Sequence, residues 1–470
     1  MNLLHRRTWL ALAAAALLAG CASTPPPAPA PVASGEAQPP IVFVHGNGDS
    51  AALWHTTMWR WESNGWPRER LHAVNFPYPL ARDDNSQAQA GRSGSDEQRA
   101  HLAAEVDRVL AATGARQLVL MANSRGGNAV RDCIATPAEQ GGCAGKVSHA
   151  ILGGTPNHGV WANAGFRPNN EFNGAGPFLT RLNAPKGPNG DEVTPGLKWL
   201  TIRSDNNDKF AQPDGVWIGA KGTPTNVSFD GPALKGAENV VLPGRDHREV
   251  SYHADAFAQA YRFVTGRAPA SLAITPQPRI TLDGLATGAS AAGPSNLPLA
   301  GARVTVYAVD AQTGERRGAA LLDKTTGADG RWGPLETDSR TALEFVLASP
   351  VAGQATVHIY RAPFLRSSSL VHLRPERLAP ADAQAGAVVQ FTRPRGYFGL
   401  PRDQILLDGQ AAPGIPPGVA GVASSKLLLP AEAVGRAVVG DYRSGSVAER
   451  IVGRSWPAKD GHLTVLELHE

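Results

Sequence analysis

Between Ile41 and about Gly266, short apolar runs alternate with longer segments of helical character. The run "PIVFVHG" is apolar at every position before its histidine and glycine, and five later runs repeat the type. Strands without a polar side are buried on both faces, and in a parallel sheet the intervening helices supply that cover. The pattern predicts a doubly wound α/β domain with a mostly parallel sheet. The five later runs are "LHAVNFPY", "RQLVLMA", "VSHAILGG", "LKWLTIRS" and "NVVLPG".

One of the intervening helices can be predicted in some detail. Ser95 and Gln98 have the spacing of a capping box, which marks a helix start. Gly114 is expected to end the helix, because glycine readily adopts the left-handed conformation of a C-terminal cap. The apolar face of this helix consists of Leu102, Val106, Val109 and Leu110.

The sequence pattern changes after residue 266. At 470 residues it exceeds the size of one ordinary domain. From about Ile280 onward, runs such as "ARVTVYAVD" and "HLTVLELHE" have the character of strands and are broken by Gly, Pro and Asp turns. We predict an all-β module, a sandwich or a barrel, over residues 267–470, with a division into two subdomains near Pro394 as an alternative to a single unit.

The first 21 residues have the features of an export signal. A basic start at Arg6 and Arg7 precedes an apolar run that is too short to span a bilayer. The ending Leu18-Ala19-Gly20-Cys21 resembles a bacterial lipobox, in which the cysteine is lipidated; a plain cleaved signal with an incidental cysteine is the alternative. Residues 22–39 form a Pro/Ala-rich tether. We therefore expect an exported lipoprotein anchored to a membrane through Cys21, and Ala22 favours the outer membrane or cell surface.

Two further cysteines lie close together in "CIATPAEQGGC". In an oxidising exported setting Cys133 and Cys143 are expected to form a disulfide that closes a short loop, with two buried free thiols as the alternative. A net charge of +4 over this length is too dilute for a nucleic-acid surface, so no nucleic acid is expected as a partner.

The strongest chemical signal is the stretch "LVLMANSRGGNAV". Its centre, Ala122-Asn123-Ser124-Arg125-Gly126, approximates the G-x-S-x-G turn that exposes a nucleophilic serine between a strand and a helix. Alanine is small enough for the first position, and a strand and a helix are predicted on the two sides. We interpret Ser124 as a catalytic nucleophile rather than as a polar residue in an ordinary turn.

The turn "FVHGNGDS" at the end of the first strand could stabilise a negative charge on a substrate oxygen. Attack on an ester carbonyl develops an oxyanion, and hydrogen-bond donors must already point at it. The backbone N–H groups of Asn47 and Arg125 are the predicted donors. His45 in this turn is interpreted as structural.

A serine nucleophile needs a general base, and four histidines follow Ser124 within the domain: His149, His158, His247 and His253. His247 follows the last predicted strand in a loop, where the base of such a domain is expected. His149 lies inside a predicted strand, His158 comes too early in the chain, and His253 is interpreted as a solvated or helix-capping residue.

A carboxylate that orients this histidine should follow the preceding strand. Asp205 and Asp208 in "RSDNNDKFAQPDG" both qualify. The alternative is that these side chains only form Asx turns or bind calcium, although the spacing of a calcium-binding EF-hand is missing.

Aromatic residues are candidates for an acyl pocket. An insertion of some 40 residues before "LKWLTIRS" could form a lid, and its apolar side chains could line a pocket, although ordinary packing of a long loop is the alternative. The tryptophans that follow "FVHGNGDS" are interpreted mainly as core residues, with Trp54 as a candidate pocket wall. They are Trp54, Trp59, Trp61 and Trp66. The candidates from the insertion are Trp161, Phe166, Phe172 and Phe178.

The order of "VHGNGD", "ANSRGG", "RSDNND" and "PGRDH" resembles bacterial lipases and carboxylesterases of the α/β-hydrolase superfamily over residues 40–266. "DKFAQP" resembles the ending that follows the acid in that family, which favours Asp208. The C-terminal part is similar to the β-domain of archaeal two-domain long-chain lipases, on "ARVTVYAVDAQTGERRG", "GADGRWG" and "IYRAPFLRSSSLVHLRPER". Ala122 and Asn123 depart from the usual glycine and histidine, which bears on substrate range.

The resemblance implies a serine ester hydrolase with the triad Ser124, Asp208 and His247, acting on acyl lipids of medium or long chain through an acyl-enzyme. It implies no cofactor and no metal, and we expect a monomer. A polyester hydrolase with the same triad is one alternative function. A non-catalytic surface lipoprotein that binds lipid or another ligand is the other.

Overall fold

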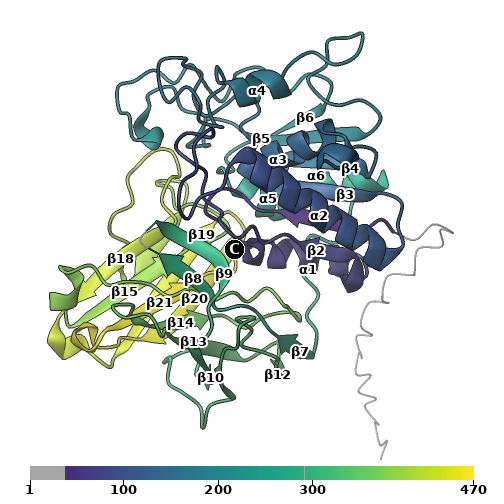
Figure 1. The fold of residues 1–470 in the computed structure, drawn as a ribbon. Helices are drawn as coiled ribbons and strands as arrows, with labels where there is room; N and C mark the ends of the chain where they lie inside the picture. The colour runs from purple at the N-terminus through teal and green to yellow at the C-terminus, as the bar shows by residue number, and fades with distance from the viewer. Residues whose placement is uncertain (1–37, 291) are drawn as a thin grey trace, which may run out of the picture.

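The computed structural model describes residues 38–290 and 292–470. The predicted signal sequence and the lipobox cysteine Cys21 lie outside the described residues. Figure 1 shows two parts, a purple-to-teal part that carries the helices and a green-to-yellow part made of strands. Within the described ranges, no helix is long and apolar enough to cross a membrane.

The first part is built on a six-stranded sheet in the order β2-β1-β3-β4-β5-β6, with every neighbouring pair parallel. The six strands coincide with the six apolar runs, so the prediction of a doubly wound parallel sheet is confirmed. The strand bounds are β1 Ile41–Val44, β2 Leu71–Ala73, β3 Leu118–Asn123, β4 Val147–Gly153, β5 Lys198–Ser204 and β6 Glu238–Leu242.

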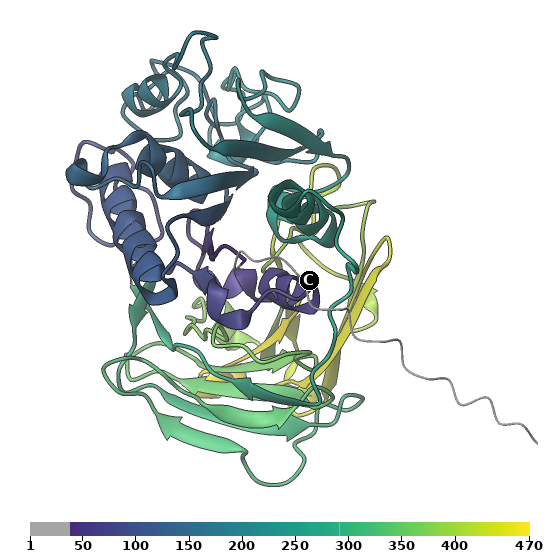
Figure 2. The ribbon, with the colours of Figure 1, turned by 90° about the vertical axis from the view of Figure 1, so that its right-hand side faces the viewer.

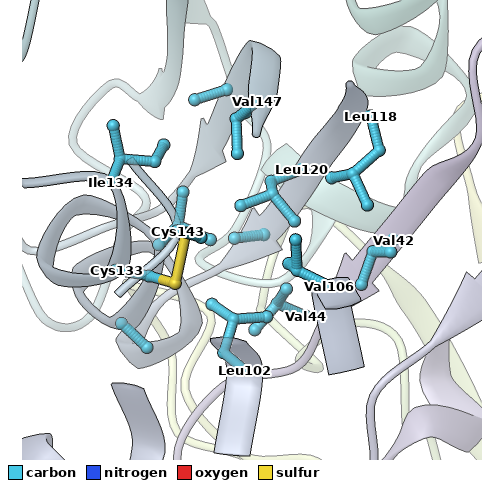
Figure 3. Packing of buried hydrophobic residues seen from close by; sticks show 14 of the residues in the cluster. Val42, Val44, Leu102, Val106, Leu118, Leu120, Cys133, Ile134, Cys143 and Val147 are labelled. Carbon is cyan, nitrogen blue, oxygen red and sulfur yellow. A yellow bond between two sulfur atoms is a disulfide. The ribbon is translucent and has the colours of Figure 1, made fainter. Parts of the chain in front are cut away.

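Both faces of this sheet are covered along β1, β3 and β4, whereas the edge strand β6 is largely exposed. Val42 and Leu120 belong to a hydrophobic core with helices α2 and α3 (Figure 3). Their neighbours Phe43 and Met121 belong to a second core on the opposite face, with helices α1 and α6. The helix bounds are α1 His55–Ser63, α2 Ser95–Thr113, α3 Arg125–Ala135, α4 Pro177–Leu182, α5 Glu249–Tyr252 and α6 Ala254–Thr265.

The predicted capping box of α2 is one residue out of place. Gly94 is the N-cap, and its N–H donates to Oε2 of Glu97 at 2.6 Å. Ser95 is already the first helical residue, and its N–H donates to Oδ1 of Asn85 at 2.9 Å. The sequence pattern is ambiguous here because both pairs have the same spacing. Gly114 does end the helix in a left-handed conformation, with φ 66°.

The second part consists of β-sheets, as predicted. Its largest sheet has seven strands in the order β11-β10-β13-β14-β21-β15-β18, in which β21 runs parallel to both of its neighbours. This sheet takes strands from both sides of Pro394. Its strands are β10 Arg303–Val309, β11 Leu322–Thr325, β13 Ala342–Ala348, β14 Thr356–Arg361, β15 Ala387–Thr392, β18 Ser424–Leu429 and β21 His462–Glu467.

Smaller sheets cover the two faces of this large sheet. On one face, Ile359 of β14 shares a core with Ile280 and Leu335 of the pair β7 and β12. On the other face, Tyr360 shares a core with Tyr442 of the four-stranded sheet β17-β16-β19-β20. The remaining strands are β7 Arg279–Leu282, β8 Thr287–Ser290, β9 Gly293–Pro298, β12 Leu335–Asp338, β16 Gln404–Leu407, β17 Gln410–Ala411, β19 Ala437–Ser444 and β20 Val447–Arg454.

The two parts meet along helix α1, which lies between the parallel sheet and the β-domain (Figure 2). Trp59 of this helix packs in the core of the β-domain, and its Nε1 donates to the carbonyl oxygen of Ser367 at 2.9 Å. Arg60 forms an ion pair with Glu470 at the end of the chain. The part with the parallel sheet and the β-domain therefore share a packed interface. The short 3₁₀ helices are η1 Ala51–Trp54, η2 Arg68–Arg70, η3 Ala138–Gln140, η4 Val216–Ile218, η5 Asp382–Gln384, η6 Ala431–Ala433 and η7 Ala458–Asp460.

Candidate active site

Ser124 lies in the turn between β3 and α3, in a backbone conformation that few residues other than glycine adopt. Its φ is 50° and its ψ is −124°, and such positive φ values carry strain of about 1–3 kcal/mol. The N–H of Ser124 donates to the carbonyl oxygen of Gly153 at 2.8 Å, which holds the turn against β4. A strained serine between a strand and a helix, at the carboxyl edge of a parallel sheet, has the geometry of a nucleophile elbow.

Small residues make this turn possible. A β-carbon added to Gly126 would lie 2.5 Å from the carbonyl oxygen of His45. A β-carbon added to Gly46 would lie 3.1 Å from the β-carbon of Ser124. Ala122, which stands where related turns have glycine, packs in the core beneath α2 and α3. The side chain of Ala122 is therefore accommodated in the core beside the turn.

His247 and Asp208 form a buried pair at the same edge of the sheet. His247 follows β6 and Asp208 follows β5, and His247 Nδ1 lies 2.9 Å from Asp208 Oδ2. Oδ1 of the same carboxylate accepts from the N–H of Phe210 at 2.8 Å, which fixes its orientation. The ring of Phe210 packs edge-on against His247 at 4.6 Å between centroids.

The second ring nitrogen of His247 is available for chemistry. Its Nε2 is buried and has no hydrogen-bond partner among the described residues. Ser124 and His247 line one cavity of about 250 Å³. A histidine that is fixed at one nitrogen by a carboxylate and has the other free beside a serine can act as a general base.

The other candidates for the acid and the base lie in structural positions. Oδ2 of Asp205 accepts from the N–H of Gly244 at 2.9 Å, so this carboxylate ties its own loop to the turn after β6. His149 packs against Phe263 at 5.4 Å. His253 caps α6 by accepting from the N–H of Asp255, which confirms the predicted capping role.

The two predicted oxyanion donors come from the loop after β1 and from the start of α3. Asn47 lines the cavity with Ser124, and its Oδ1 accepts from the N–H of Ala81 at 2.7 Å, which anchors the loop. Arg125 is the first residue of α3. The N–H groups in a first helical turn have no intrahelical acceptor and can receive a negative charge.

The side chain of Arg125 has a structural role that the sequence does not indicate. It is buried and ion-paired with Glu171, which is also buried. It donates to the carbonyl oxygens of Pro79 at 3.0 Å and Ser93 at 2.6 Å. Burial lowers the pKa of Arg125, against the carboxylate of Glu171, and burial raises the pKa of Glu171. This pair ties α3 to two loops, and its partner lies too far along the chain for a local motif to reveal it.

The predicted aromatic pocket residues separate into two groups. Trp161 and Phe172 line the candidate catalytic cavity, and Phe166 packs against Trp161 at 5.7 Å without lining it. Trp54 lies elsewhere, in the core between Phe43 and Tyr252, because the first helical turn points it at the sheet. Phe178 also lies elsewhere, in a small cluster with Leu179 and Leu182 of α4.

The β-domain also reaches this site, which the sequence does not predict. Tyr397, in the loop between β15 and β16, lines the candidate catalytic cavity. The Nζ of Lys209 lies 3.8 Å from the centroid of its ring, and the guanidinium carbon of Arg248 lies 4.9 Å from it. Burial lowers the pKa of Lys209 to about 8. The residues that directly follow the candidate acid and base, Lys209 and Arg248, thus contact a tyrosine of the second domain.

The remaining features concern cysteines and metals. Cys133 and Cys143 form a disulfide, as predicted, within the core shown in Figure 3. Among the residues that the structure describes, no group of three or more His, Cys, Asp or Glu side chains is placed to hold a metal ion.

Three solved structures are similar to parts of this chain at low sequence identity. The Bacillus licheniformis lipase BlEst2 is 20% identical over 51% of this chain and 96% of its own, with a TM-score of 0.34. Phospholipase PlaB from Legionella pneumophila is 11% identical over 73% and 96%, with a TM-score of 0.34. The carboxylesterase CesB from Bacillus subtilis is 14% identical over 49% and 84%, with a TM-score of 0.26.

Among curated proteins, none matches this chain. A family model does match part of it: residues 278–378 match the lipase C-terminal domain. These residues contain β10, β13 and β14 of the large sheet. The parallel sheet with its serine turn has the α/β-hydrolase topology. The chain therefore has an α/β-hydrolase fold, and its residues 278–378 match the lipase C-terminal domain.

Proposed function

We propose that the protein is a serine ester hydrolase that cleaves carboxylic esters, with acyl lipids as its substrates. The observation that carries this proposal is the hydrogen bond between His247 and Asp208 beside a cavity that Ser124 also lines. The match of residues 278–378 to a lipase domain supports the choice of lipid esters.

The reaction proceeds in two halves. In the first half, Ser124 Oγ attacks the ester carbonyl carbon while His247 Nε2 takes the hydroxyl proton. The N–H groups of Asn47 and Arg125 stabilise the negative oxygen of the tetrahedral intermediate. The carbon–oxygen bond to the alcohol then breaks, and His247 gives its proton to the departing alcohol. An acyl group remains on Ser124.

In the second half, a water molecule gives a proton to His247 and attacks the acyl carbon. The bond to Ser124 Oγ breaks, Oγ recovers the proton, and the carboxylic acid leaves. Asp208 stays ionised throughout, holds the imidazole in the tautomer that leaves Nε2 free, and stabilises its charged form.

Hydrolysis of p-nitrophenyl butyrate by the purified protein tests the proposal. We expect Ser124→Ala to lower kcat by at least about 10⁴-fold. Ser148→Ala is the matched control, because Ser148 is a serine of β4 that donates to the carbonyl oxygen of Leu118 away from the cavity. A fluorophosphonate probe should label the parent protein and not Ser124→Ala. Full activity in Ser124→Ala would exclude the mechanism.

A second pair of variants tests the base. His247→Ala should abolish turnover, whereas His253→Ala should keep it and lose about 1 kcal/mol of stability, the usual effect of removing a helix cap. The opposite result would assign the base to His253. A protein that binds lipid without turnover would leave both the probe and the ester unchanged.

We also propose that the mature protein is anchored to a membrane through lipidated Cys21, on the strength of the lipobox. Metabolic labelling with palmitate in a bacterial host tests it. Label should appear in the parent protein and disappear in Cys21→Ser, and equal label in both would overturn the proposal.

A further inference from the structure

A second cavity, of about 230 Å³, lies where the first domain meets the seven-stranded sheet. One wall comes from the segment around η1 of the first domain. The opposite wall comes from β14, β15, β21 and the residues around Arg374. This cavity and the catalytic cavity have no lining residue in common.

Two guanidinium groups in this cavity lack a carboxylate partner. Arg395 is 4% exposed, and its nitrogens donate only to backbone carbonyl oxygens and to Nδ1 of His55. Arg374 donates to Oδ1 of Asn296 at 2.7 Å. Among the described residues, neither side chain forms an ion pair. A third arginine in the cavity, Arg361, is paired with Glu467.

Burial without a counter-ion is costly for a charged group. Burial lowers the pKa of Arg395 to about 10 although the carboxylate of Glu467 raises it. Burial also lowers the pKa of Arg374, although the carboxylates of Asp49 and Glu376 raise it without forming an ion pair with it.

Arg393 gives the contrast. Burial lowers its pKa too, but the carboxylates of Glu249 and Asp246 raise it above its ordinary value. An anion in the cavity would stabilise the charged guanidinium groups of Arg374 and Arg395, as Glu249 stabilises that of Arg393.

The unsatisfied polar atoms of the cavity point to the same kind of ligand. His55 Nε2, Arg361 Nε, Arg374 Nε and Thr392 Oγ1 are buried and have no hydrogen-bond partner within the described residues. Arginine nitrogens can only donate. Since Nδ1 of His55 accepts from Arg395, the proton of this neutral ring is on Nε2, which therefore also donates. Donors and positive charge thus gather in one cavity.

The cavity also has an apolar part and two carboxylates. Leu53, Val357 and Ile359 line it with alkyl side chains. Of the two carboxylates, that of Glu467 forms an ion pair with Arg361, and Glu376 is an exposed residue. The cavity therefore combines hydrogen-bond donors that lack an acceptor with an apolar surface.

We propose that this cavity binds an oxyanion, a carboxylate or a phosphate group, between Arg374 and Arg395, with the donors of His55 and Thr392 completing its hydrogen bonds. Guanidinium groups suit both anions because their planar donors match two oxygens at once. The site is separate from the proposed esterase reaction and does not depend on it.

Titration calorimetry of the full chain with sodium phosphate and with sodium octanoate, at constant ionic strength, tests the site. Saturable binding of phosphate alone would identify a phosphate group as the ligand, and binding of octanoate alone would identify an apolar carboxylate. Binding of both would show that the oxyanion alone is recognised. If neither binds, and neither raises Tm above its value in sodium chloride, the proposal is wrong.

Variants assign any binding to this cavity. Arg374→Gln should raise Kd by about tenfold or more, since it removes a charged donor. Arg377→Gln, three residues further on and exposed, should leave Kd unchanged. Thr392→Val removes one hydroxyl with little change in shape and should raise Kd several-fold; it decides the question alone if Arg374→Gln does not fold. Unchanged binding in the folded variants would place the anion elsewhere and overturn the proposal.

Discussion

Arg393, in the loop after β15, donates from Nη1 to Oδ2 of Asp246 at 3.1 Å, and Asp246 directly precedes His247. Its Nη2 donates to Oε1 of Glu249 at 2.6 Å. Arg402 also donates to Glu249, at 2.7 Å. Although burial raises the pKa of Glu249, the two arginines lower it below its ordinary value. Arg393 and Arg402 of the β-domain therefore bind the loop of the candidate base on both sides of His247.

We expect Arg393→Met to weaken both the interface and the site. Removing one partner of a buried ion pair costs about 3–5 kcal/mol, because the carboxylates stay buried without compensation. If Arg393 positions His247, kcat for p-nitrophenyl butyrate falls while KM changes little, in protein that circular dichroism shows to be folded.

Arg450→Met is the matched control for this prediction. Arg450 pairs with Asp441 on an exposed strand, where ion pairs contribute about 0–1 kcal/mol. Its kcat and stability should stay near those of the parent protein. A folded Arg393→Met protein with parental kcat would show that the arginines stabilise the interface without positioning the base.

Asp208→Asn tests the candidate acid. The amide would disturb the tautomer of His247 and could not stabilise its charged form, so kcat should fall by about 10³–10⁴-fold. Asp205→Asn is the control, because Asp205 holds a backbone turn instead. If Asp205→Asn caused the larger loss of kcat, the assignment of the acid would be reversed.

The sequence predicted the sheet and its serine turn because their signals are local. Each strand lies in a mostly apolar run, and the turn at Ser124 is recognised from five adjacent residues. The pairing of His247 with Asp208 could be anticipated because each follows its own strand, and parallel strands end at one edge of the sheet.

What the sequence could not predict depends on residues that lie far apart in the chain. Arg393 and Asp246 are 147 positions apart. Glu171, the partner of Arg125, lies on a loop without regular structure. Trp54 and Trp161 are both aromatic, yet only Trp161 lines the cavity. The side on which such a ring packs is decided by tertiary contacts and not by its neighbours in sequence.

Glu171→Gln should destabilise the loops beside the active site. It leaves the buried guanidinium of Arg125 without its counter-ion, which we expect to cost about 3 kcal/mol. Urea unfolding measures the loss, and limited proteolysis should show faster cleavage near residue 171. Glu432→Gln, on an exposed turn, provides the control. Equal stability in the two variants would contradict a role for the pair.

The disulfide should matter for stability and not for turnover. Cys133 and Cys143 are ten positions apart, and the closure of a loop of this length contributes about 3 kcal/mol through the unfolded state. The double variant Cys133→Ala, Cys143→Ala should lose about that much in urea unfolding and keep its kcat at 25 °C. A large loss of kcat in folded protein would mean that α3 and Ser124 shift when the link is removed.

Glu449, on β20, gives the fold a dependence on pH. Its two carboxylate oxygens accept from the N–H of His469, both at 2.9 Å. Burial raises its pKa from 4.5 to about 7, against these hydrogen bonds. The folded chain therefore holds the proton more tightly than the unfolded chain. The resulting stabilisation is fully present below pH 4.5 and is lost as the pH rises through about 7.

Glu449→Gln should remove this dependence. A shift of this size corresponds to about 3 kcal/mol at most, and since Glu449 is only half-buried we expect about 1–2 kcal/mol. The free energy of unfolding in urea is measured at pH 8 and at pH 4.5. The parent protein loses stability between pH 4.5 and pH 8 through Glu449, and Glu449→Gln should lose less by that amount. The comparison between pH values cancels any hydrogen bond that the amide loses at both. The exposed Glu139→Gln should change nothing, and an identical pH difference in Glu449→Gln and the parent protein would show that Glu449 titrates normally.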